Sequence, residues 1–359
     1  MLIALAVASI ACPNVHAESR AAPDAVSEEC GPTESLHFIC GPVGSEDLVH
    51  VPGTRWLITS GLNVGSPAHL YLIDTREKRA TTIFPLDNAL RMEVEHALTL
   101  DCSGPPDLTR MSTDGLALRP APSQNGGYFL YAANHGDRFA IEMFEVNTHG
   151  ELPQLRWVGC MLLPPHTLPN GVAALPDGGL LVTSFHDPQD EKKAWAEMAR
   201  GENTGRLLEW HAASGFHDVP GVSVSGANGI DLSADASLVY LSAWATREIV
   251  VISRKGGTPP RRIPLDFLPD NIHRLPDGSL LVGGQRTDVQ KIAACGAQCP
   301  QPWVIARVDP VSGAVHRVLE GQGTRAVNYA CGGILVDHTL YVTARGDRRV
   351  IYALASDLQ

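Results

Sequence analysis

The sequence predicts an all-β fold, namely a six-bladed β-propeller with a short helical insertion near one mouth of its central channel. One pattern occurs six times along the 359 residues: a polar side chain, a short apolar strand, a turn and a second apolar strand. The polar residues stand at positions 46, 114, 170, 228, 270 and 328, so successive units begin 42 to 68 residues apart. Four-stranded units that repeat on this scale are typical of propeller blades.

The strands can be placed unit by unit. The fifth unit shows the pattern most clearly, because Asp270 and Asn271 precede an apolar run and the turn Pro276-Asp277-Gly278 leads to a second one. We expect second strands at residues 56–59, 129–131, 180–182, 238–241, 280–283 and 340–342. Third strands are expected at residues 70–73, 141–146, 207–210, 249–252, 304–308 and 350–354.

Helical periodicity is scarce. The best candidate is the segment 190–200, which places Trp195 and Met198 on one face of a helix. This segment interrupts the third unit, so we interpret it as a loop insertion over one mouth of the channel. The tripeptide Arg345-Gly346-Asp347 is interpreted as a tight turn before the final strand.

The chain divides into three parts by sequence. Residues 1–17 resemble a secretory signal, since the apolar run 2–11 is followed by small residues that end at Ala17. A run of this length is too short to span a bilayer, which takes about 20 residues. Residues 18–43 form an N-terminal segment, and residues 44–359 form the propeller. We therefore expect a periplasmic or secreted protein without a stable membrane span.

Charge and cysteine content limit the partners and the compartment. The net charge is −11 and no basic cluster is present, which argues against nucleic acid as a partner. Removal of residues 1–17 would leave seven of the eight cysteines. In an oxidising compartment these suggest up to three disulfides. The candidate pairs are Cys295 with Cys299, Cys30 with Cys40, and Cys102 with Cys160. A zinc site at Cys295 and Cys299 is the alternative, but no second pair or histidine cluster completes it.

The opening residues of the six units should point into one channel. They are Glu46, Asp114, Asn170, Asn228, Asp270 with Asn271, and Asn328. Turn conformation alone is an alternative explanation for each, because Asp, Asn and Gly are common turn residues. As a ring, however, they supply only oxygen ligands, which favours calcium over zinc. The carboxylates of Glu46 and Asp270 would balance the charge of one Ca²⁺.

Four short strings in register resemble the paraoxonase/arylesterase family of calcium-dependent lactonases. They are Gly44-Ser45-Glu46-Asp47-Leu48, Asn134-His135, Ala227-Asn228-Gly229-Ile230 and Asp266-Phe267 followed by Asp270-Asn271-Ile272. The resemblance runs from about residue 44 to residue 354. The wider group includes gluconolactonase-like and strictosidine-synthase-like six-bladed propellers.

The resemblance implies two calcium sites. The ligands of the catalytic calcium would be Glu46, Asn170, Asn228, Asp270 and Asn271. A second, structural calcium would use Asp47, the carbonyl of Leu116 and an acidic residue at position 171. This chain has Gly171 there, so it lacks one ligand of the second site. The family also joins its N-terminal segment to its last strand by a disulfide, and Ala353 stands at the matching position here.

The family's hydrolytic pair consists of two histidines above the catalytic calcium. The outer one matches His135, whereas the inner one, expected to act on the attacking water, falls at Asp114. Asp114 is therefore either the general base or an additional metal ligand, and His186 is an alternative base. Trp195 and Met198 resemble the family's apolar lid, although packing of the inserted helix explains them equally well.

These observations predict a calcium-dependent hydrolase of lactones or aryl esters that acts on a small-molecule substrate. In this mechanism, calcium would polarise the carbonyl, and water activated by Asp114 or His135 would attack it. One alternative is a non-catalytic binding propeller, because fold does not fix function. A gluconolactonase-like sugar-lactone hydrolase with a different divalent ion is another.

Overall fold

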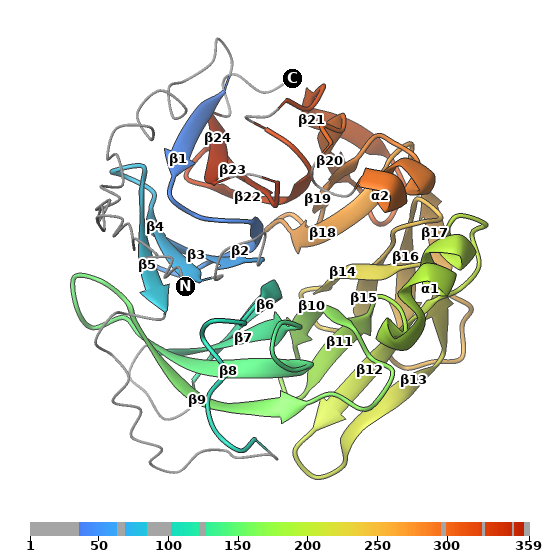
Figure 1. Cartoon of the computed structure of the whole chain (residues 1–359), viewed down its shortest axis with the longest axis horizontal. Coiled ribbons are helices and arrows are strands. Elements are labelled where there is room, and N and C mark those ends of the chain that lie inside the picture. The colour runs from blue at the N-terminus through green and yellow to red at the C-terminus, as the bar shows by residue number, and fades with distance from the viewer. Residues whose placement is uncertain are drawn as a thin grey trace, which may run out of the picture.

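The structure of the protein is a computed structural model that describes residues 36–62, 69–84, 102–121, 127–295, 299–324, 327–346 and 348–354. The described strands form six four-stranded sheets. These sheets are arranged like blades around one central axis (Figure 1). The predicted six-bladed β-propeller is therefore confirmed.

Each blade is an antiparallel sheet whose first strand lies innermost. Blade 1 contains β2 (Ser45–His50), β3 (Trp56–Gly61), β4 (Leu70–Asp74) and β5 (Arg79–Phe84). Blade 2 contains β6 (Thr113–Pro120), β7 (Tyr128–Asn134), β8 (Ala140–Asn147) and β9 (Gln154–Leu162). Blade 3 contains β10 (Pro169–Ala174), β11 (Leu180–Ser184), β12 (Gly205–His211) and β13 (Gly215–Val224).

The other three blades repeat this arrangement. Blade 4 contains β14 (Ala227–Leu232), β15 (Leu238–Ala243), β16 (Glu248–Ser253) and β17 (Arg261–Pro264). Blade 5 contains β18 (Leu268–Arg274), β19 (Leu280–Gln285), β20 (Trp303–Val308) and β21 (Val315–Gly321). Blade 6 contains β22 (Ala330–Val336), β23 (Thr339–Ala344) and β24 (Arg349–Leu354), with β1 (His37–Cys40) as its outer strand. All the predicted second and third strands are present.

The strand β1 closes the ring. It pairs antiparallel with β24, so that His37 lies opposite Tyr352 and Cys40 lies opposite Arg349. The N-terminal segment thus supplies the fourth strand of the last blade, before the chain begins blade 1 (Figure 1). Sequence reasoning began the propeller at residue 44, because a four-residue strand is too short to show a periodicity. Backbone pairing with β24 joins the two ends of the ring.

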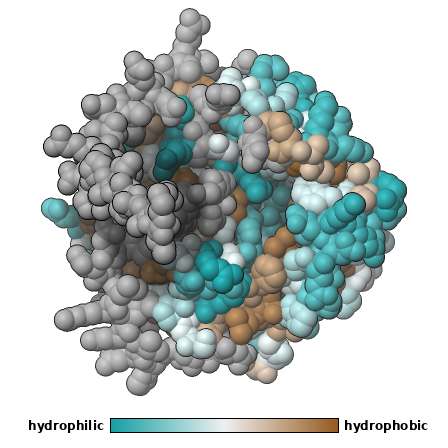
Figure 2. All heavy atoms as spheres, viewed as in Figure 1, coloured by the Kyte–Doolittle hydropathy of each residue, from teal (hydrophilic) through white to brown (hydrophobic). Residues whose placement is uncertain are grey.

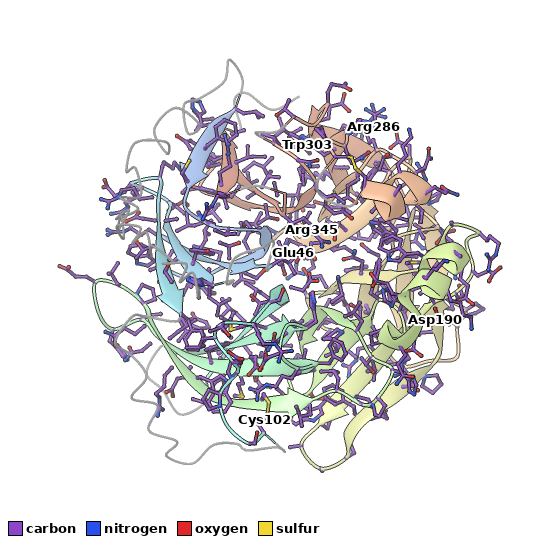
Figure 3. All side chains as sticks on the ribbon, in the orientation of Figure 1. Glu46, Cys102, Asp190, Arg286, Trp303 and Arg345 are labelled. Carbon is purple, nitrogen blue, oxygen red and sulfur yellow. A yellow bond between two sulfur atoms is a disulfide. The ribbon has the colours of Figure 1, made fainter. Side chains whose placement is uncertain are left out.

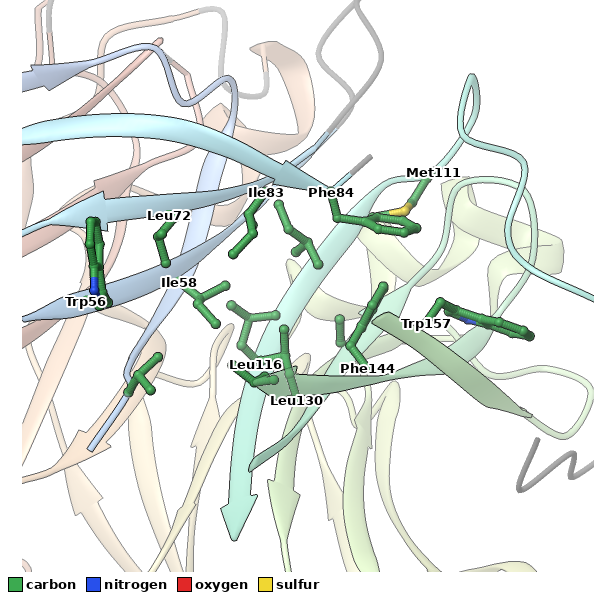
Figure 4. Packing of buried hydrophobic residues seen from close by; sticks show 14 of the residues in the cluster. Trp56, Ile58, Leu72, Ile83, Phe84, Met111, Leu116, Leu130, Phe144 and Trp157 are labelled. Carbon is green, nitrogen blue, oxygen red and sulfur yellow. The ribbon is translucent and has the colours of Figure 1, made fainter. Parts of the chain in front are cut away.

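The core lies between neighbouring blades. Figure 4 shows the interface of blades 1 and 2, where apolar side chains of the two sheets interdigitate. Phe84 and Phe144 meet there edge to face, with ring centroids 4.9 Å apart. Such offset aromatic pairs add to the burial of apolar area. Comparable apolar clusters fill the other interfaces and hold the blades in fixed positions around the axis.

Two short helices lie over the same side of the ring. The predicted insertion is confirmed as α1 (Glu191–Met198), which follows a 3-10 turn at Pro188–Asp190. Asp190 caps it by accepting a hydrogen bond from the N–H of Lys193. A second helix, α2 (Val289–Cys295), was not predicted, and it contacts α1 (Figure 1).

Two of the three predicted disulfides are confirmed, namely Cys102–Cys160 and Cys295–Cys299. Cys40 is also disulfide-bonded, but Cys30, its predicted partner, lies outside the described residues. The predicted signal segment 1–17 lies outside them as well. Among the described residues, no helix has the length and apolar character that crossing a membrane would need.

Candidate metal centre and active site

The first strand of every blade is irregular where it reaches the channel. Its register against the second strand shifts at residues 45–48, 113–116, 169–172, 227–230, 269–272 and 330–333. A β-bulge re-aims the side chains that it contains and is common beside active sites. The residues in equivalent bulge positions are Glu46, Asp114, Asn170, Asn228, Asp270 and Cys331. We call these six residues the inner ring.

The structure corrects one predicted member of this ring. Asn328 precedes β22, and its Oδ1 accepts a hydrogen bond from the backbone N–H of Gln301 at 3.0 Å. Cys331 occupies the sixth position instead, and its Sγ lies within 4.8 Å of carboxylate oxygens of Glu46 and Asp270. Asn328 was predicted because it is the polar residue that opens the sixth unit of the sequence. The pairing of β22 with β23 instead brings Cys331 into the channel.

Glycine follows three of the ring residues because the first strands come very close there. A Cβ on Gly115 would lie 2.5 Å from the carbonyl oxygen of Asn170, one on Gly171 would lie 2.8 Å from that of Asn228, and one on Gly229 would lie 2.4 Å from that of Asp270. None of these glycines has a positive φ. Close approach of the backbones therefore explains them better than a turn does.

Threonines on the second strands hold the bulges in place. Thr183 Oγ1 accepts a hydrogen bond from the N–H of Gly171 at 2.7 Å and donates one to the carbonyl of Asn228, also at 2.7 Å. Thr343 does the same in blade 6, where it donates to the carbonyl of Glu46 at 2.7 Å. These bonds fix the backbone of the ring residues to the neighbouring blade.

Four oxygen atoms of the inner ring are buried without a hydrogen-bond partner. They are Oε2 of Glu46, Oδ1 of Asp114, Oδ1 of Asn170 and Oδ1 of Asn228. A buried polar atom without a partner is costly and needs an explanation. Carboxylate and amide oxygens are the ligands of a hard cation such as Ca²⁺. The donor set of the inner ring therefore fits the predicted calcium.

The remaining two predicted ligands are also in place. Asn271 Nδ2 donates to Glu46 Oε1 at 3.0 Å and to its carbonyl at 3.1 Å. Asp270 Oδ2 accepts a hydrogen bond from Gln285 Nε2 at 2.9 Å. Gln285 is oriented in turn by Trp244, whose Nε1 donates to its Oε1 at 3.1 Å. Such supporting bonds fix the orientation of a metal-binding carboxylate. All five predicted ligands of the catalytic calcium thus converge on the channel.

The carboxyl groups of the ring are electrostatically unfavourable without a cation. Burial, together with the charges of Asp114 and Asp270, raises the pKa of Glu46 well above its usual range. Burial also raises the pKa of Asp270, to about 7. Burial acts in the same direction on Asp114, but its interactions with neighbouring Glu46 and with the imidazole of His135 leave its pKa below the usual value. A divalent cation would remove the repulsion that protonation relieves here.

Asp114 is paired with the predicted outer histidine. His135 Nε2 lies 3.1 Å from Asp114 Oδ2, and Asn170 Nδ2 donates to the same oxygen at 3.1 Å. The His135 side chain is 20% exposed, whereas that of Asp114 is 6% exposed. An ionised Asp114 therefore accepts the proton on Nε2, which leaves Nδ1 of His135 as the basic nitrogen.

The predicted second metal site does not fit a cation. Both carboxylate oxygens of Asp47 are engaged, since Oδ2 accepts from the N–H of Leu116 at 2.7 Å and Oδ1 lies 2.8 Å from His273 Nε2. Burial opposes a charge on His273, yet Asp47 raises the pKa of this histidine above its usual value. Gly171 supplies no carboxylate. His273 is therefore the charged partner of Asp47 here, and both residues line a cavity of about 200 Å³.

The other predicted residues have mainly structural contacts. His186 is buried, and its Nδ1 lies 2.9 Å from the carbonyl of Asp187. Met198 is buried beneath α1, and Trp195 packs edge to face on Trp244 with centroids 5.7 Å apart. Packing of the inserted helix thus accounts for both residues.

Sequence reasoning missed three side chains at this centre. They are Cys331, Gln285 and Arg345, and Figure 3 shows Arg345 beside Glu46 near the axis of the propeller. Arg345 directly follows β23, as His135 directly follows β7. The equivalence of these two positions was the signal that could have identified it.

Comparisons with known proteins agree with this fold. Residues 36–324 match the family model described as Arylesterase. No curated protein matches the sequence. A luciferin-regenerating enzyme has a similar structure, with a TM-score of 0.54 and 13% identity over 90% of this chain and 97% of that one. A calcium-binding protein from Agrobacterium tumefaciens, regucalcin, has a TM-score of 0.52 and 10% identity over 90% and 94% of the two chains. At these identities, the two structures show a common propeller fold.

Proposed function

This chain belongs to the arylesterase family, and we propose that it is a calcium-dependent hydrolase of lactones or aryl esters. The observation that carries the proposal is the set of four buried oxygens of the inner ring that lack hydrogen-bond partners. Beside them, Asp114 and His135 form a carboxylate–imidazole pair. A hard-cation site next to such a pair has the parts that ester hydrolysis by water requires.

The ring residues would hold the cation, with Glu46, Asn170, Asn228, Asp270 and Asn271 as its ligands. A bound calcium ion would supply Lewis-acid stabilisation of the negative charge that develops on the ester carbonyl oxygen. Gln285 keeps the Asp270 carboxylate in position through its hydrogen bond. Burial of these side chains excludes water and strengthens their electrostatic effect on the carbonyl.

His135 would act as the general base. Asp114 accepts the Nε2 proton and fixes the ring, so that Nδ1 can take a proton from the attacking water. The imidazolium that forms is stabilised by the Asp114 carboxylate, as in other carboxylate–histidine pairs. The proton on Nδ1 is then available to the leaving alcohol or phenol. In this assignment Asp114 orients the His135 ring and is not itself the general base.

Substrate assays and one variant test the proposal. The purified protein should hydrolyse an aryl ester or a lactone of a panel that includes phenyl acetate and γ- and δ-lactones. His135→Gln should lose most of this activity while it keeps the melting temperature. If calcium binds but no ester or lactone is hydrolysed, the protein is a binding propeller and the proposal fails.

We also propose that the protein is exported to the periplasm or secreted. The disulfides Cys102–Cys160 and Cys295–Cys299 support this, because stable disulfides are rare in a reducing cytosol. Cell fractionation with N-terminal sequencing should find the mature chain outside the cytoplasm, beginning at Glu18. Recovery of the intact chain from the cytoplasm would contradict export.

A further inference from the structure

A second set of equivalent side chains lies where the second strands end. In each blade, one register pair of the first and second strands directly precedes the bulge. One residue beyond the second-strand member of that pair, the six blades carry Leu62, His135, Phe185, Trp244, Gln285 and Arg345. We call these residues the outer set. Two of them contact the inner ring directly, since His135 lies against Asp114 and Gln285 donates to Asp270. The outer set therefore borders the proposed reaction centre.

The outer set has an apolar half. Phe185 and Trp244 of blades 3 and 4 pack edge to face with centroids 5.6 Å apart. Trp195 of α1 joins them, with centroids 6.2 Å from Phe185 and 5.7 Å from Trp244. Trp244 is fully buried and Trp195 packs α1 onto it, so the partly buried ring of Phe185 is the one that suits the hydrocarbon or aryl part of a substrate. In Figure 2, hydrophilic and hydrophobic residues both occur near the centre of the face shown.

Arg345 is the permanent cation of the outer set. Its guanidinium carbon lies 5.1 Å from the centroid of the Tyr329 ring, and its Nε is buried without a hydrogen-bond partner. The carboxylates of Asp114 and Glu46 lie close enough to favour its positive charge, but among the described residues no carboxylate forms a direct ion pair with it. Arginine is rarely left in this state, because its donors are costly to bury unpaired. The side chain is thus held by stacking, with donors available to a ligand.

The charges of the centre allow an anion to bind there. Glu46, Asp114 and Asp270 contribute three negative charges when ionised, and a divalent cation offsets two of them. The positive charge of Arg345 offsets the third. Because the loaded centre would then be close to neutral, a ligand carboxylate would meet a guanidinium without a net repulsive field. The planar fork of arginine binds a carboxylate through two parallel hydrogen bonds.

We propose that Arg345 binds a carboxylate carried by the substrate, so that the preferred esters or lactones bear an acid group beside the scissile bond. The acid group lies toward blade 6, and the apolar part lies toward Phe185 of blade 3. This inference rests on the proposed hydrolase function. It assigns Arg345 a role in substrate selection. Other residues would bind the cation and act as the base.

Paired substrates test the selection. A γ-lactone that carries a ring carboxylate is compared with its carboxamide, which has the same shape without the charge. Wild-type kcat/KM should favour the carboxylate about 10-fold or more, the range of a hydrogen bond to a charged group. Arg345→Met should remove this preference, whereas Arg345→Lys should keep part of it. Arg286→Met is the matched control. Arg286 directly follows the second strand of blade 5, as Arg345 follows that of blade 6, but its Nη1 pairs with Glu320 Oε2 at 2.9 Å.

Binding provides a readout that does not depend on hydrolysis. Calcium-loaded protein is titrated calorimetrically with cyclopentanecarboxylate and with cyclopentanecarboxamide. Wild type and Arg286→Met should bind the carboxylate more tightly than the amide, and Arg345→Met should not distinguish them. This arm decides the proposal even if no ester is hydrolysed, so failure of the hydrolase function is recognised separately.

Three results would overturn the proposal. One is a wild-type protein without preference for the carboxylate in either experiment. Another is an unchanged preference for the carboxylate in Arg345→Met, which would mean that the bound cation alone binds the substrate carboxylate. The third is an equal loss of kcat/KM for the carboxylate and the carboxamide in Arg345→Met, together with weaker calcium binding. Arg345 would then serve only as a counter-charge for the inner ring.

Discussion

The Nε2 atom of His135 lies 3.1 Å from Oδ2 of Asp114, and Asn170 donates to the same oxygen at 3.1 Å. Asp114 stands where the arylesterase resemblance leads one to expect a histidine. Its second oxygen is buried without a partner and faces the same centre as the predicted ligands. One carboxylate thus serves the base through Oδ2 and is available to the cation through Oδ1.

This pairing predicts the effects of substitutions at both residues. His135→Gln removes the basic nitrogen and should lower kcat about 10²–10⁴-fold. Asp114→Asn should give a loss of similar size, because it removes the charge that stabilises the imidazolium. Asp114→His, which restores the expected residue, should retain hydrolysis. Wild-type rates in His135→Gln would exclude His135 as the base.

Ligands and merely buried polar residues should behave differently. Asn228→Ala and Asp270→Ala each remove an oxygen from the inner ring and should weaken calcium binding at least about 10-fold. Asn328→Ala is the control. It removes an acceptor for the N–H of Gln301 and no member of the inner ring, so it should lower the melting temperature and leave calcium affinity unchanged. Isothermal titration of all three variants checks this, and equal affinities would show that the ring does not bind the ion.

The pair of Asp47 and His273 predicts a single calcium per chain. His273→Ala removes the partner of the Asp47 carboxylate and should lower the melting temperature, because a buried charge loses its counter-charge. The position opposite Asp47 still lacks an acidic residue at Gly171, so the variant should not gain a second ion. Metal analysis by mass spectrometry decides this. Two calcium ions bound per wild-type chain would contradict the idea that His273 is the partner of Asp47 instead of a second ion.

The carboxyl groups of the ring predict how calcium stabilisation depends on pH. The pKa of Asp270 is raised to about 7, and that of Glu46 is also raised. The metal-free folded chain therefore retains protons that the unfolded chain loses above about pH 4, so its stability falls as pH rises toward 7. Calcium must displace these protons and binds more tightly as pH rises.

The measurement is the melting temperature of metal-free and calcium-saturated protein across this range. The difference between the two should widen from about pH 5.5 to about pH 8, as the carboxyl groups lose their protons. The Asp270→Asn variant, which has no proton to lose at this position, should show a weaker dependence. A difference that stays constant with pH would contradict the raised pKa values.

Much of the fold could be predicted from the sequence because each blade repeats a local pattern. The turn and strand residues of each unit are contiguous, so the six repeats and the candidate calcium ligands at their openings were recognisable by spacing. The strand His37–Cys40 was not, because its pairing with β24 is a contact between the two ends of the chain. Its four residues carry no pattern that distinguishes them from a loop.

The inner ring shows the same limit at the level of single residues. Membership depends on the bulge in each first strand, which is a property of strand pairing. Cys331 has neither the residue type of a calcium ligand nor a turn signal, whereas Asn328 has both and lies outside the ring. Arg345 was interpreted only as part of a turn, although the equivalence with His135 places it beside the reaction centre.

The central claim is that the inner ring binds one calcium ion and that this ion is required for hydrolysis. The most direct test titrates metal-free protein with calcium while bound metal and ester hydrolysis are followed in the same samples. Activity should rise in proportion to bound calcium and reach its maximum at one ion per chain. Saturating calcium should also raise the melting temperature, since about 100-fold excess over Kd adds about 2.7 kcal/mol to the free energy of unfolding. Hydrolysis that proceeds at full rate in the metal-free protein would contradict the account.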